Sequence, residues 1–369
     1  MEPKRKIRWA VIGLGNIAQV AVLPAFEHAS ENSELVALVS SDPEKLRVLG
    51  KKYDVSVTGS YDDIDRVVGE AGVDAVYVAV PNSLHREITE RAARAGAHVL
   101  CEKPMATNVA DCEAMIRATD DAGVKLMIAY RLHFERANLE AIERVKRGDI
   151  GEPRIFSSVF SHQVREGDIR TRAETGGGAL LDMGTYCLNA ARYVFRAEPQ
   201  SVAAMQTVGT EERFRHVDEM TTAILRFPGD RIAQFVASQG AANVSEFRVV
   251  GTDGHIRLDP AFEYSTAVEG EMDVGGDKTH LEGEKKDQFA PELVYFADCI
   301  LEDETPEPSG EEGLADVRVM EAIIRAAATR SVVDLPPFEK HERPNQRLEM
   351  RKPPVGKQKT VHAPSPSAK

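Results

Sequence analysis

The residues best suited to chemistry lie in one short stretch, which reads Gly-Gly-Gly-Ala-Leu-Leu-Asp-Met-Gly-Thr-Tyr over residues 176–186. Three glycines break the chain, and the apolar run behind them predicts a helix that extends to about residue 195. Asp182 and Tyr186 are four residues apart, so a helix places both side chains on one face. A carboxylate beside a phenol can transfer protons, although a carboxylate is also favoured near a helix N-terminus for structural reasons alone.

A cation can reach the same site from a second stretch, Glu102-Lys103-Pro104. It follows residues 98–101, whose short apolar run predicts a strand of a parallel sheet. Ligands of such sheets bind outside the carboxyl ends of the strands, so a lysine at this strand end is predicted to face a ligand rather than open surface. Lys103, Asp182 and Tyr186 together therefore predict a proton-transfer site, which neither stretch predicts alone.

The element that positions a ligand there begins the chain. Residues 7–12 predict a strand, Gly13-Leu14-Gly15-Asn16-Ile17-Ala18 follows, and a helical pattern continues through residue 26. Gly13 permits the tight turn, Gly15 lets a pyrophosphate approach the backbone, and the helix N-terminus offers free N–H groups to the phosphates. A glycine pattern alone is weak evidence, but its place between a strand and a helix predicts a dinucleotide site. The predicted contacts around the pyrophosphate are Gly13, Gly15, Asn16 and Ile17.

The end of the second predicted strand, residues 35–39, bears on which dinucleotide binds. NAD-specific sites usually place an acidic residue there, which binds the ribose 2′-hydroxyl. This chain has Ser40-Ser41 followed by Lys45, and two hydroxyls with a lysine suit a 2′-phosphate, which favours NADP. Asp42 keeps NAD possible, while Ser-Asp-Pro is also an ordinary start of a helix.

Other strand ends add candidate contacts. Residues 73–80 predict a buried strand that ends at Pro81-Asn82, and His85 lies four residues after Pro81. His85 touches cofactor or substrate in one interpretation, and is a capping or solvated histidine in the other. Residues 125–129 predict the last parallel strand. The predicted cofactor contacts in this part of the chain are Pro81, Asn82, His85, Glu102, Lys103 and Arg131.

After residue 148 the pattern changes to strands, which predicts a second domain. Asp253-Gly254 predicts a tight hairpin turn, and residues 263–287 are polar and are predicted to be irregular. Helical patterns follow over 289–301 and 311–330. Strands grouped after an α/β half predict an α+β domain with a large, mostly antiparallel open sheet. Its predicted strands are 155–160, 201–208, 221–227, 232–238 and 247–251.

We therefore predict an α/β chain with an N-terminal Rossmann domain of doubly wound parallel sheet over residues 1–129. Residues 130–338 form the α+β domain for substrate binding and oligomerisation. The tail, residues 339–369, is rich in Pro, Lys and Arg and cannot bury a core of its own. Disorder is the default expectation for it, and the alternative is an extended arm on this or a neighbouring subunit.

Composition excludes several classes of partner. The net charge of -13 argues against nucleic acid or an anionic membrane as the main partner. No apolar run approaches the roughly 20 residues of a membrane helix, and residues 1–9 lack the apolar core of a secretory signal. The four cysteines show no metal-type spacing, no metal site is predicted, and reduced thiols of a cytoplasmic protein are expected.

Together these motifs resemble the glucose–fructose oxidoreductase/inositol dehydrogenase (Gfo/Idh/MocA) family over roughly residues 7–335. The resemblance rests on the glycine turn, on Glu102-Lys103-Pro104, on Tyr130-Arg131 and on the stretch with Asp182 and Tyr186. Many members carry His where this chain has Tyr186, and tyrosine there is similar to the glucose–fructose and aldose–aldose oxidoreductase branch. A tryptophan which that branch can carry upstream of the glycines is absent, because residues 168–172 read Asp-Ile-Arg-Thr-Arg.

The resemblance implies an NADP-dependent sugar oxidoreductase, with NAD possible, that transfers hydride between C1 of an aldose and the nicotinamide. One alternative keeps the nucleotide bound and passes hydride to a second sugar. Another is an ordinary sugar or dihydrodiol dehydrogenase or reductase with exchangeable NAD(P). A third, a non-catalytic nucleotide-binding protein, is disfavoured by the intact Lys103, Asp182 and Tyr186.

The resemblance also implies roles for single residues. Tyr186 is the acid/base, and its phenolate needs about 4 kcal/mol of preferential stabilisation, which the Lys103 ammonium can supply. Asp182 orients the sugar and keeps Lys103 charged, Glu102 positions the loop, and the bond Lys103–Pro104 is cis. The predicted substrate contacts are Lys103, Arg131, Asp182, Tyr186 and Tyr264. The open sheet face, apolar on strands 221–227 and 232–238, is predicted to be buried in a homodimer or homotetramer.

Overall fold

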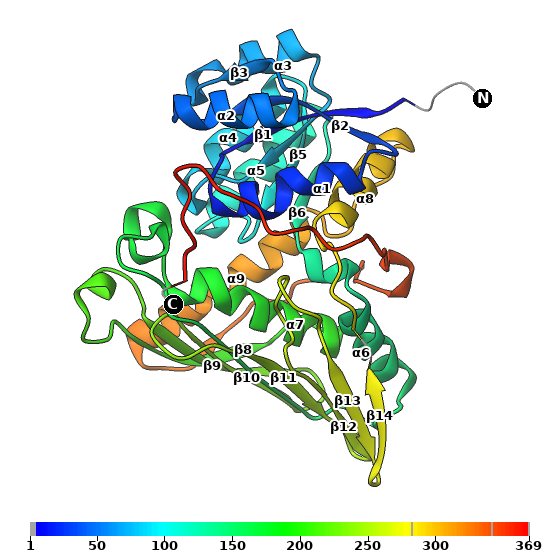
Figure 1. Cartoon of the computed structure of the whole chain (residues 1–369). Helices are drawn as coiled ribbons and strands as arrows, with labels where there is room; N and C mark the ends of the chain where they lie inside the picture. The colour runs from blue at the N-terminus through cyan, green and yellow to red at the C-terminus, as the bar shows by residue number, and fades with distance from the viewer. Residues whose placement is uncertain (1–4, 282, 341, 368–369) are drawn as a thin grey trace.

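Two sheets organise the chain, as Figure 1 shows for a computed structural model that describes residues 5–281, 283–340 and 342–367. The first sheet has six parallel strands in the order β3-β2-β1-β4-β5-β6, which is the order of a dinucleotide-binding Rossmann fold. The predicted fold class is therefore confirmed. The strands are β1 (Ile7–Ile12), β2 (Ser33–Val39), β3 (Val57–Gly59), β4 (Ala75–Val78), β5 (His98–Glu102) and β6 (Leu126–Ala129).

Helices cover both faces of the first sheet. The helix after the glycine turn begins with a π-helical turn, η1 (Ala18–Val22), and continues as α1. Helix α8 also packs on this sheet, with the ring centroid of Phe296 5.9 Å from that of Trp9, although the sequence placed residues 290–301 in the second domain. The helices of this layer are α1 (Leu23–His28), α2 (Pro43–Tyr53), α3 (Ile64–Ala71), α4 (His85–Arg94), α5 (Val109–Asp121) and α8 (Ala290–Leu301).

The second sheet has nine strands in the order β14-β13-β12-β11-β7-β10-β9-β8-β15. Only the central pair β7 and β10 is parallel among the strand pairs of this part of the described chain. The predicted hairpin at Asp253-Gly254 joins β11 to β12 and is confirmed. The strands are β7 (Ile155–Ser161), β8 (Ser201–Thr207), β9 (Met220–Phe227), β10 (Arg231–Ser238), β11 (Val244–Val250), β12 (Gly254–Leu258), β13 (Gly270–Val274), β14 (Asp277–Leu281) and β15 (Val333–Asp334).

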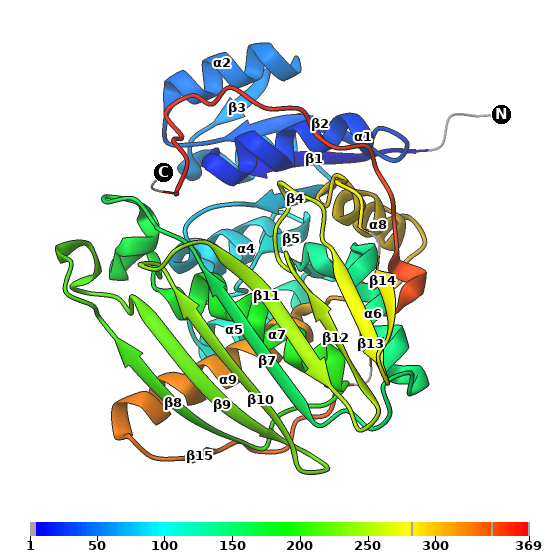
Figure 2. The same ribbon diagram turned by 60° about the horizontal axis from the view of Figure 1, so that its bottom comes forward.

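The expectation that residues 263–287 are irregular was wrong. Strands β13 and β14 lie in that range and extend the sheet at one edge (Figure 2). Gly275 and Gly276 join them with φ of 63° and 95°, which only glycine adopts freely and which suits a two-residue hairpin turn.

The two faces of the second sheet differ. The inner face packs phenylalanine rings, such as Phe156, Phe235 and Phe247, under helices α6 (Arg136–Arg147) and α7 (Thr185–Phe195). The outer face leaves Ile155, Ile224 and Ile232 39–50% exposed, in adjacent strands and with Ile155 paired to Ile232. Helix α9 (Gly310–Thr329) packs on α5, β6 and β8 and so joins the two layers. The apolar outer face is therefore an unpartnered surface of the single chain.

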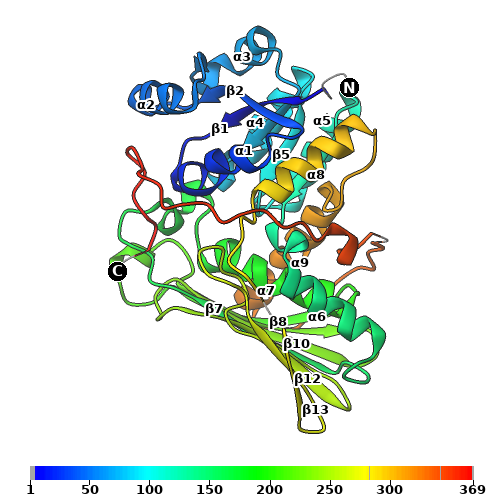
Figure 3. The same ribbon diagram turned by 45° about the vertical axis from the view of Figure 1, so that its right-hand side comes forward.

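The tail is an extended arm on its own chain, which was the second of the two expectations for it. Figure 3 shows it as the red segment that crosses from the side of α8, past α1, toward the lower layer. It contains one short 3₁₀ turn, η9 (Gln346–Leu348), among its described residues. It adds no core of its own, in agreement with its composition, and lies on surfaces that the rest of the chain provides.

Candidate active site

One large crevice, of about 480 Å³, lies where the two layers meet. Its volume is typical of a site for a small ligand or cofactor. The glycine turn after β1 lies at one end, and the loops after β5 and β7 and the start of α7 surround the other. Ten of the predicted site residues line it, namely Gly15, Asn16, Ile17, Asn82, Glu102, Lys103, Arg131, Asp182, Tyr186 and Tyr264.

The three predicted catalytic side chains meet in this crevice. Lys103 Nζ donates to the backbone carbonyl of Asp182 at 3.0 Å and lies 3.5 Å from Asp182 Oδ1. The same ammonium is 4.4 Å from the centroid of the Tyr186 ring. Lys103 follows strand β5 and its bond to Pro104 is cis, as expected. Lys103 thus contacts both the Asp182 carboxylate and the Tyr186 ring, which brings an amine, a carboxylate and a phenol into one site.

Asp182 is held in its charged form. Burial alone would raise the pKa of this carboxyl group, but the Arg170 guanidinium, with Lys103 and His162, holds the pKa well below its usual range. Arg170 Nε donates to Asp182 Oδ2 at 2.8 Å, and Arg170 also binds Asp168 at 3.2 Å. Asp182 is therefore an anion at neutral pH, which suits orienting hydroxyls and holding a lysine but not donating a proton.

A second cation faces the phenol. The guanidinium carbon of Arg131 is 5.0 Å from the Tyr186 ring centroid and 5.3 Å from that of Tyr264. Burial alone would lower the pKa of Arg131, but the nearby Tyr186 side chain raises it. Arg131 is 4% exposed and is fixed by hydrogen bonds to the Gln288 side chain and the Phe262 carbonyl. Two cations thus lie against the Tyr186 ring, where the sequence assigned one.

Glu102 has a supporting position. Tyr77 donates its hydroxyl to Glu102 Oε1 at 2.9 Å, and the backbone N–H of Lys103 lies 3.3 Å from Glu102 Oε2. Burial raises the pKa of Glu102. The carboxyl group therefore braces the loop that carries Lys103, in line with the expected positioning role.

The glycine run before Asp182 is closely packed. A Cβ on Gly177 would lie 2.4 Å from the Arg170 carbonyl oxygen, and one on Gly178 would lie 2.1 Å from Asp218 Oδ1. Asp218 Oδ2 also accepts from the backbone N–H of Leu180 at 2.8 Å. The chain then forms a π-helical turn, η7 (Leu180–Gly184), before α7, where the sequence predicted one continuous helix. The glycines thus permit the close approach that places Asp182.

The glycine turn fits a dinucleotide. Gly13 has φ of 95°, and a Cβ there would lie 2.5 Å from the Ala79 carbonyl oxygen, so the tight turn requires glycine. Gly15 has open space around the position of a Cβ, so its bare backbone faces the crevice. Asn16 and Ile17 continue the lining. These residues fit a pyrophosphate laid against the start of a helix.

The adenosine end is less closely defined. Ser40 is buried and its hydroxyl accepts from the Asp42 N–H at 3.2 Å, whereas Ser41 is exposed and Lys45 is half-exposed. Asp42 caps α2, because its Oδ1 accepts from the N–H groups of Glu44 and Lys45. These side chains surround the end of β2 but do not line the crevice.

His85 lies outside the crevice lining. It is fully buried, with its ring nitrogens 2.9 Å from the Pro104 carbonyl oxygen and 3.0 Å from that of Val80. Burial lowers the pKa of His85. Pro81 and Gly13 also lie outside the lining, while Asn82 donates to the Gly176 carbonyl at 2.8 Å. In this position His85 holds the loop after Lys103.

Two crevice residues have no place in the sequence prediction. Arg170 occupies the segment where the expected tryptophan is absent, and nothing in the chain pairs it with Asp182 until the fold is known. His162 follows strand β7, and its Nε2 is buried without a partner among the described residues. The signal for His162 was a polar residue two positions after the predicted strand 155–160. A bound ligand with hydroxyl groups could satisfy that nitrogen.

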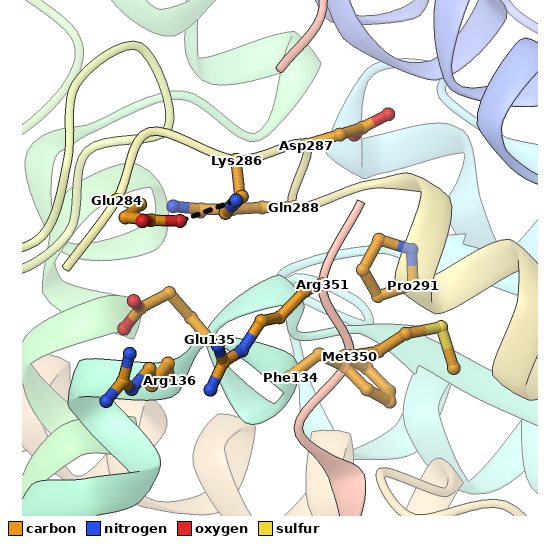
Figure 4. A pocket seen from close by; sticks show the side chains of 10 residues that line it. All are labelled: Phe134, Glu135, Arg136, Glu284, Lys286, Asp287, Gln288, Pro291, Met350 and Arg351. Atoms are coloured by element: carbon orange, nitrogen blue, oxygen red, sulfur yellow. Dashed lines mark ion pairs between the residues drawn. The ribbon is translucent and has the colours of Figure 1, made fainter. Parts of the chain in front are cut away.

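A second hollow is too small for a substrate. It encloses about 30 Å³ between the start of α6 and the tail, and Figure 4 shows its side chains, including the ion pair of Glu284 with Lys286 at 2.6 Å. Such a volume holds about one water molecule. The large crevice is the one that the predicted catalytic side chains line, and it is there that we expect a ligand to react.

Two sequence families match the chain in succession. Residues 7–130 match the family described as "Oxidoreductase family, NAD-binding Rossmann fold" (GFO_IDH_MocA). Residues 138–257 match the GFO/IDH/MocA C-terminal domain. Within the described ranges no helix is long and apolar enough to cross a membrane.

Known proteins resemble the chain over most of its length. An aldose–aldose oxidoreductase from Caulobacter crescentus, crystallised with glycerol, is 40% identical with a TM-score of 0.85, covering 90% of this chain and 100% of that one. The D-xylose 1-dehydrogenase [NADP(+)] of Haloarcula marismortui is 35% identical over 89% of this chain and 93% of its own length. A 3-ketoreductase from Actinomadura kijaniata, in complex with NADP and TDP-benzene, is 29% identical with a TM-score of 0.79 over 87% of this chain and 98% of that one.

Proposed function

Because this chain belongs to the GFO/IDH/MocA oxidoreductase family, we propose that it is an NADP-dependent sugar oxidoreductase that acts on C1 of an aldose. The observation that carries the proposal is the meeting of Lys103, Asp182 and Tyr186 in the crevice that begins at the glycine turn. The similarity to an aldose–aldose oxidoreductase and to an NADP-dependent xylose dehydrogenase supports an aldose as substrate.

The chain's own residues supply the proton chemistry. Tyr186, as phenolate, takes the proton of the sugar C1 hydroxyl at its Oη, and the oxidised sugar is a lactone. Lys103 and Arg131 stabilise the phenolate, and Lys103 also polarises the reacting oxygen. Asp182 binds a neighbouring sugar hydroxyl and forms an ion pair with Lys103. When bound, NADP accepts the hydride that leaves C1.

The nucleotide is held at two places. Gly13, Gly15, Asn16 and Ile17 bind the pyrophosphate through the bare turn and the helix start. Around the end of β2, Ser40, Ser41 and Lys45 bind the 2′-phosphate. Lys45→Ala is expected to weaken NADP binding much more than NAD binding in a fluorescence titration. Equal weakening of both would assign the ribose to Asp42 instead.

Hydride passes from one sugar to another on a nucleotide that stays bound. This version is supported by the 40% identity to an aldose–aldose oxidoreductase. A desalted sample is expected to keep its nucleotide absorbance, and deuterium from C1 of one aldose is expected in a second sugar without added NADP. A sample that loses its nucleotide and turns over only with added NADP would instead be an ordinary aldose dehydrogenase, the version supported by the xylose dehydrogenase.

The apolar outer face of the second sheet is the surface of a homodimer or homotetramer. Ile155, Ile224 and Ile232 lie on adjacent strands there and are 39–50% exposed in the single chain. Contiguous exposed apolar side chains of this kind mark interaction sites.

The four cysteines are free and buried, which fits a reducing compartment, and we place the enzyme in the cytoplasm.

A further inference from the structure

The tail follows the open side of the nucleotide crevice. Figures 1 and 3 show it between the upper and lower layers, and Figure 2 shows it passing α1 before it turns toward the second sheet. Its last described part, residues 358–367, contacts elements of both layers. We name this part the strap.

On the upper side the strap binds the helix that follows the glycine turn. Gln19 Oε1 accepts from the Val361 N–H at 2.7 Å, and Gln19 Nε2 donates to the Val361 carbonyl at 2.9 Å. Asn16 donates to the Ala363 carbonyl at 3.0 Å. Gln19 is only 1% exposed, so the strap satisfies an amide that is buried. These contacts are thus part of the packing of the glycine turn.

The strap also reaches the end of β2. His362 Nδ1 lies 2.8 Å from Asp42 Oδ2, and Lys52 donates to the Gln358 side chain at 2.8 Å. The adenosine half of a dinucleotide lies at the end of this strand in a Rossmann fold. The strap therefore passes over both the pyrophosphate turn and the adenosine end.

On the lower side the strap binds the loop after β7. The Arg165 N–H donates to the Pro366 carbonyl at 2.8 Å, Arg165 Nε donates to the Ser365 carbonyl at 3.0 Å, and Val164 forms a β-bridge with Ser367. Residues 365–367 line the same crevice as Gly15, Asn16 and Ile17. The strap thus covers one side of the crevice without filling its volume.

The base of the tail is fixed separately. Met350 and Arg351 line the small hollow of Figure 4, and Lys352 pairs with Glu31 at 2.6 Å. Residues 353–357, which include two prolines and a glycine, separate this anchor from the strap and are mostly exposed. The strap can therefore leave the crevice without disturbing either sheet.

We propose that the strap is the outer wall of the nucleotide site and that it retains NADP between the two sugar reactions. This proposal rests on the proposed function, because it assigns the retention of the nucleotide to named residues. A dinucleotide laid on the glycine turn lies beneath the strap, so it leaves only after the contacts of Val361 and Ala363 with the helix have broken.

The test uses the full-length chain with Ala363→Asp, since Ala363 is 6% exposed and a carboxylate there displaces the strap. Thr360→Asp is the matched control, because it adds the same charge three residues away at an exposed position. Val361→Pro removes the N–H donated to Gln19 by a different means. NADPH is loaded, and its release into excess NADP is followed by fluorescence.

Release from Ala363→Asp and Val361→Pro is expected to be about ten- to a hundredfold faster than from the wild type and Thr360→Asp, since up to three hydrogen bonds are lost. If NADPH leaves all four proteins at the same rate, the strap does not hold the nucleotide and the proposal is wrong. If that common rate is slow, the nucleotide is still retained, so the proposed function stands while the role of the strap does not. If NADPH leaves the wild type rapidly and leaves the two variants faster still, the strap covers the site but the nucleotide is not retained between the two sugar reactions.

Hydrogen exchange on the wild type is a second test, which does not depend on how the variants fold. NADP is expected to slow exchange at Val361, and unchanged exchange also overturns the proposal.

Discussion

Lys103→Met isolates the contribution of the ammonium to the phenolate. Lys103 Nζ lies over the Tyr186 ring, 4.4 Å from its centroid. At an effective dielectric constant of about 20, a unit charge roughly 5 Å away contributes about 3 kcal/mol. Losing it is expected to lower kcat about a hundredfold, since 1.4 kcal/mol is a factor of ten in rate. Arg131 remains near the phenol, so activity falls but does not vanish.

The assay is steady-state aldose oxidation followed by the acid that the lactone product releases on hydrolysis, with bound nucleotide measured in the same samples. Lys125→Met is the matched control, since it removes a lysine whose partner, Asp303, is at the surface. A kcat within threefold of the wild type would refute the reasoning. A loss of rate that follows a loss of nucleotide would assign Lys103 to cofactor binding alone.

Three further variants test other parts of the site and surface. Tyr186→Phe keeps the ring packing and is expected to lower kcat by about 10²–10⁴-fold with nucleotide binding unchanged. Near-normal turnover with a lowered melting temperature would instead show that Tyr186 has no part in the mechanism. Arg170→Leu is expected to raise the depressed pKa of Asp182 toward its usual value, so that Asp182 loses its charge at a higher pH than in the wild type. The fall of kcat/KM on the acid side is then expected to move to higher pH, and Arg170→Lys is expected to reverse part of that shift. An unmoved acid limb would exclude this role. Ile232→Arg is expected to yield monomers by light scattering, whereas Ile324→Arg, at a similar exposure on α9, should not; a wild type that is already monomeric would refute the interface.

The parallel sheet and the glycine turn could be predicted because their signals are local. Five of the six parallel strands contain a short apolar run and were predicted, whereas β3, which reads Val-Thr-Gly, was not. The spacing of Gly13 and Gly15 between a strand and a helix is a local pattern, although the contact that requires glycine at position 13 is with Ala79. The meeting of Lys103 with Asp182 was also within reach, because a lysine at the carboxyl end of a parallel strand has few other places to point. These inferences needed the order of strands but no knowledge of the second sheet.

Strands β13 and β14 show where local signals fail. Their sequences, Gly-Glu-Met-Asp-Val and Asp-Lys-Thr-His-Leu, are largely charged or polar, so neither propensity nor alternation identifies them. They pair because β12 offers an open edge and because Gly275-Gly276 permits the turn. The pairing of Arg170 with Asp182 is similar, since it joins a loop to a π-helical turn that no periodicity predicts.

The tail marks the limit most clearly, because its composition was read correctly and still left two outcomes open. A segment without large apolar residues cannot form a core, but an arm needs only partners for its backbone groups. Those partners are the side-chain amides of Asn16 and Gln19, one and four residues after the second glycine of the turn that binds phosphate in this fold. The buried Gln19 at the start of that helix indicates the arm, because a buried amide must be hydrogen-bonded. Its NH2 group donates to the Leu14 carbonyl and finds its second acceptor in the Val361 carbonyl of the arm. The choice between disorder and order therefore depended on a residue more than three hundred positions away, and under our proposal the same residue links retention of the nucleotide to the far end of the chain.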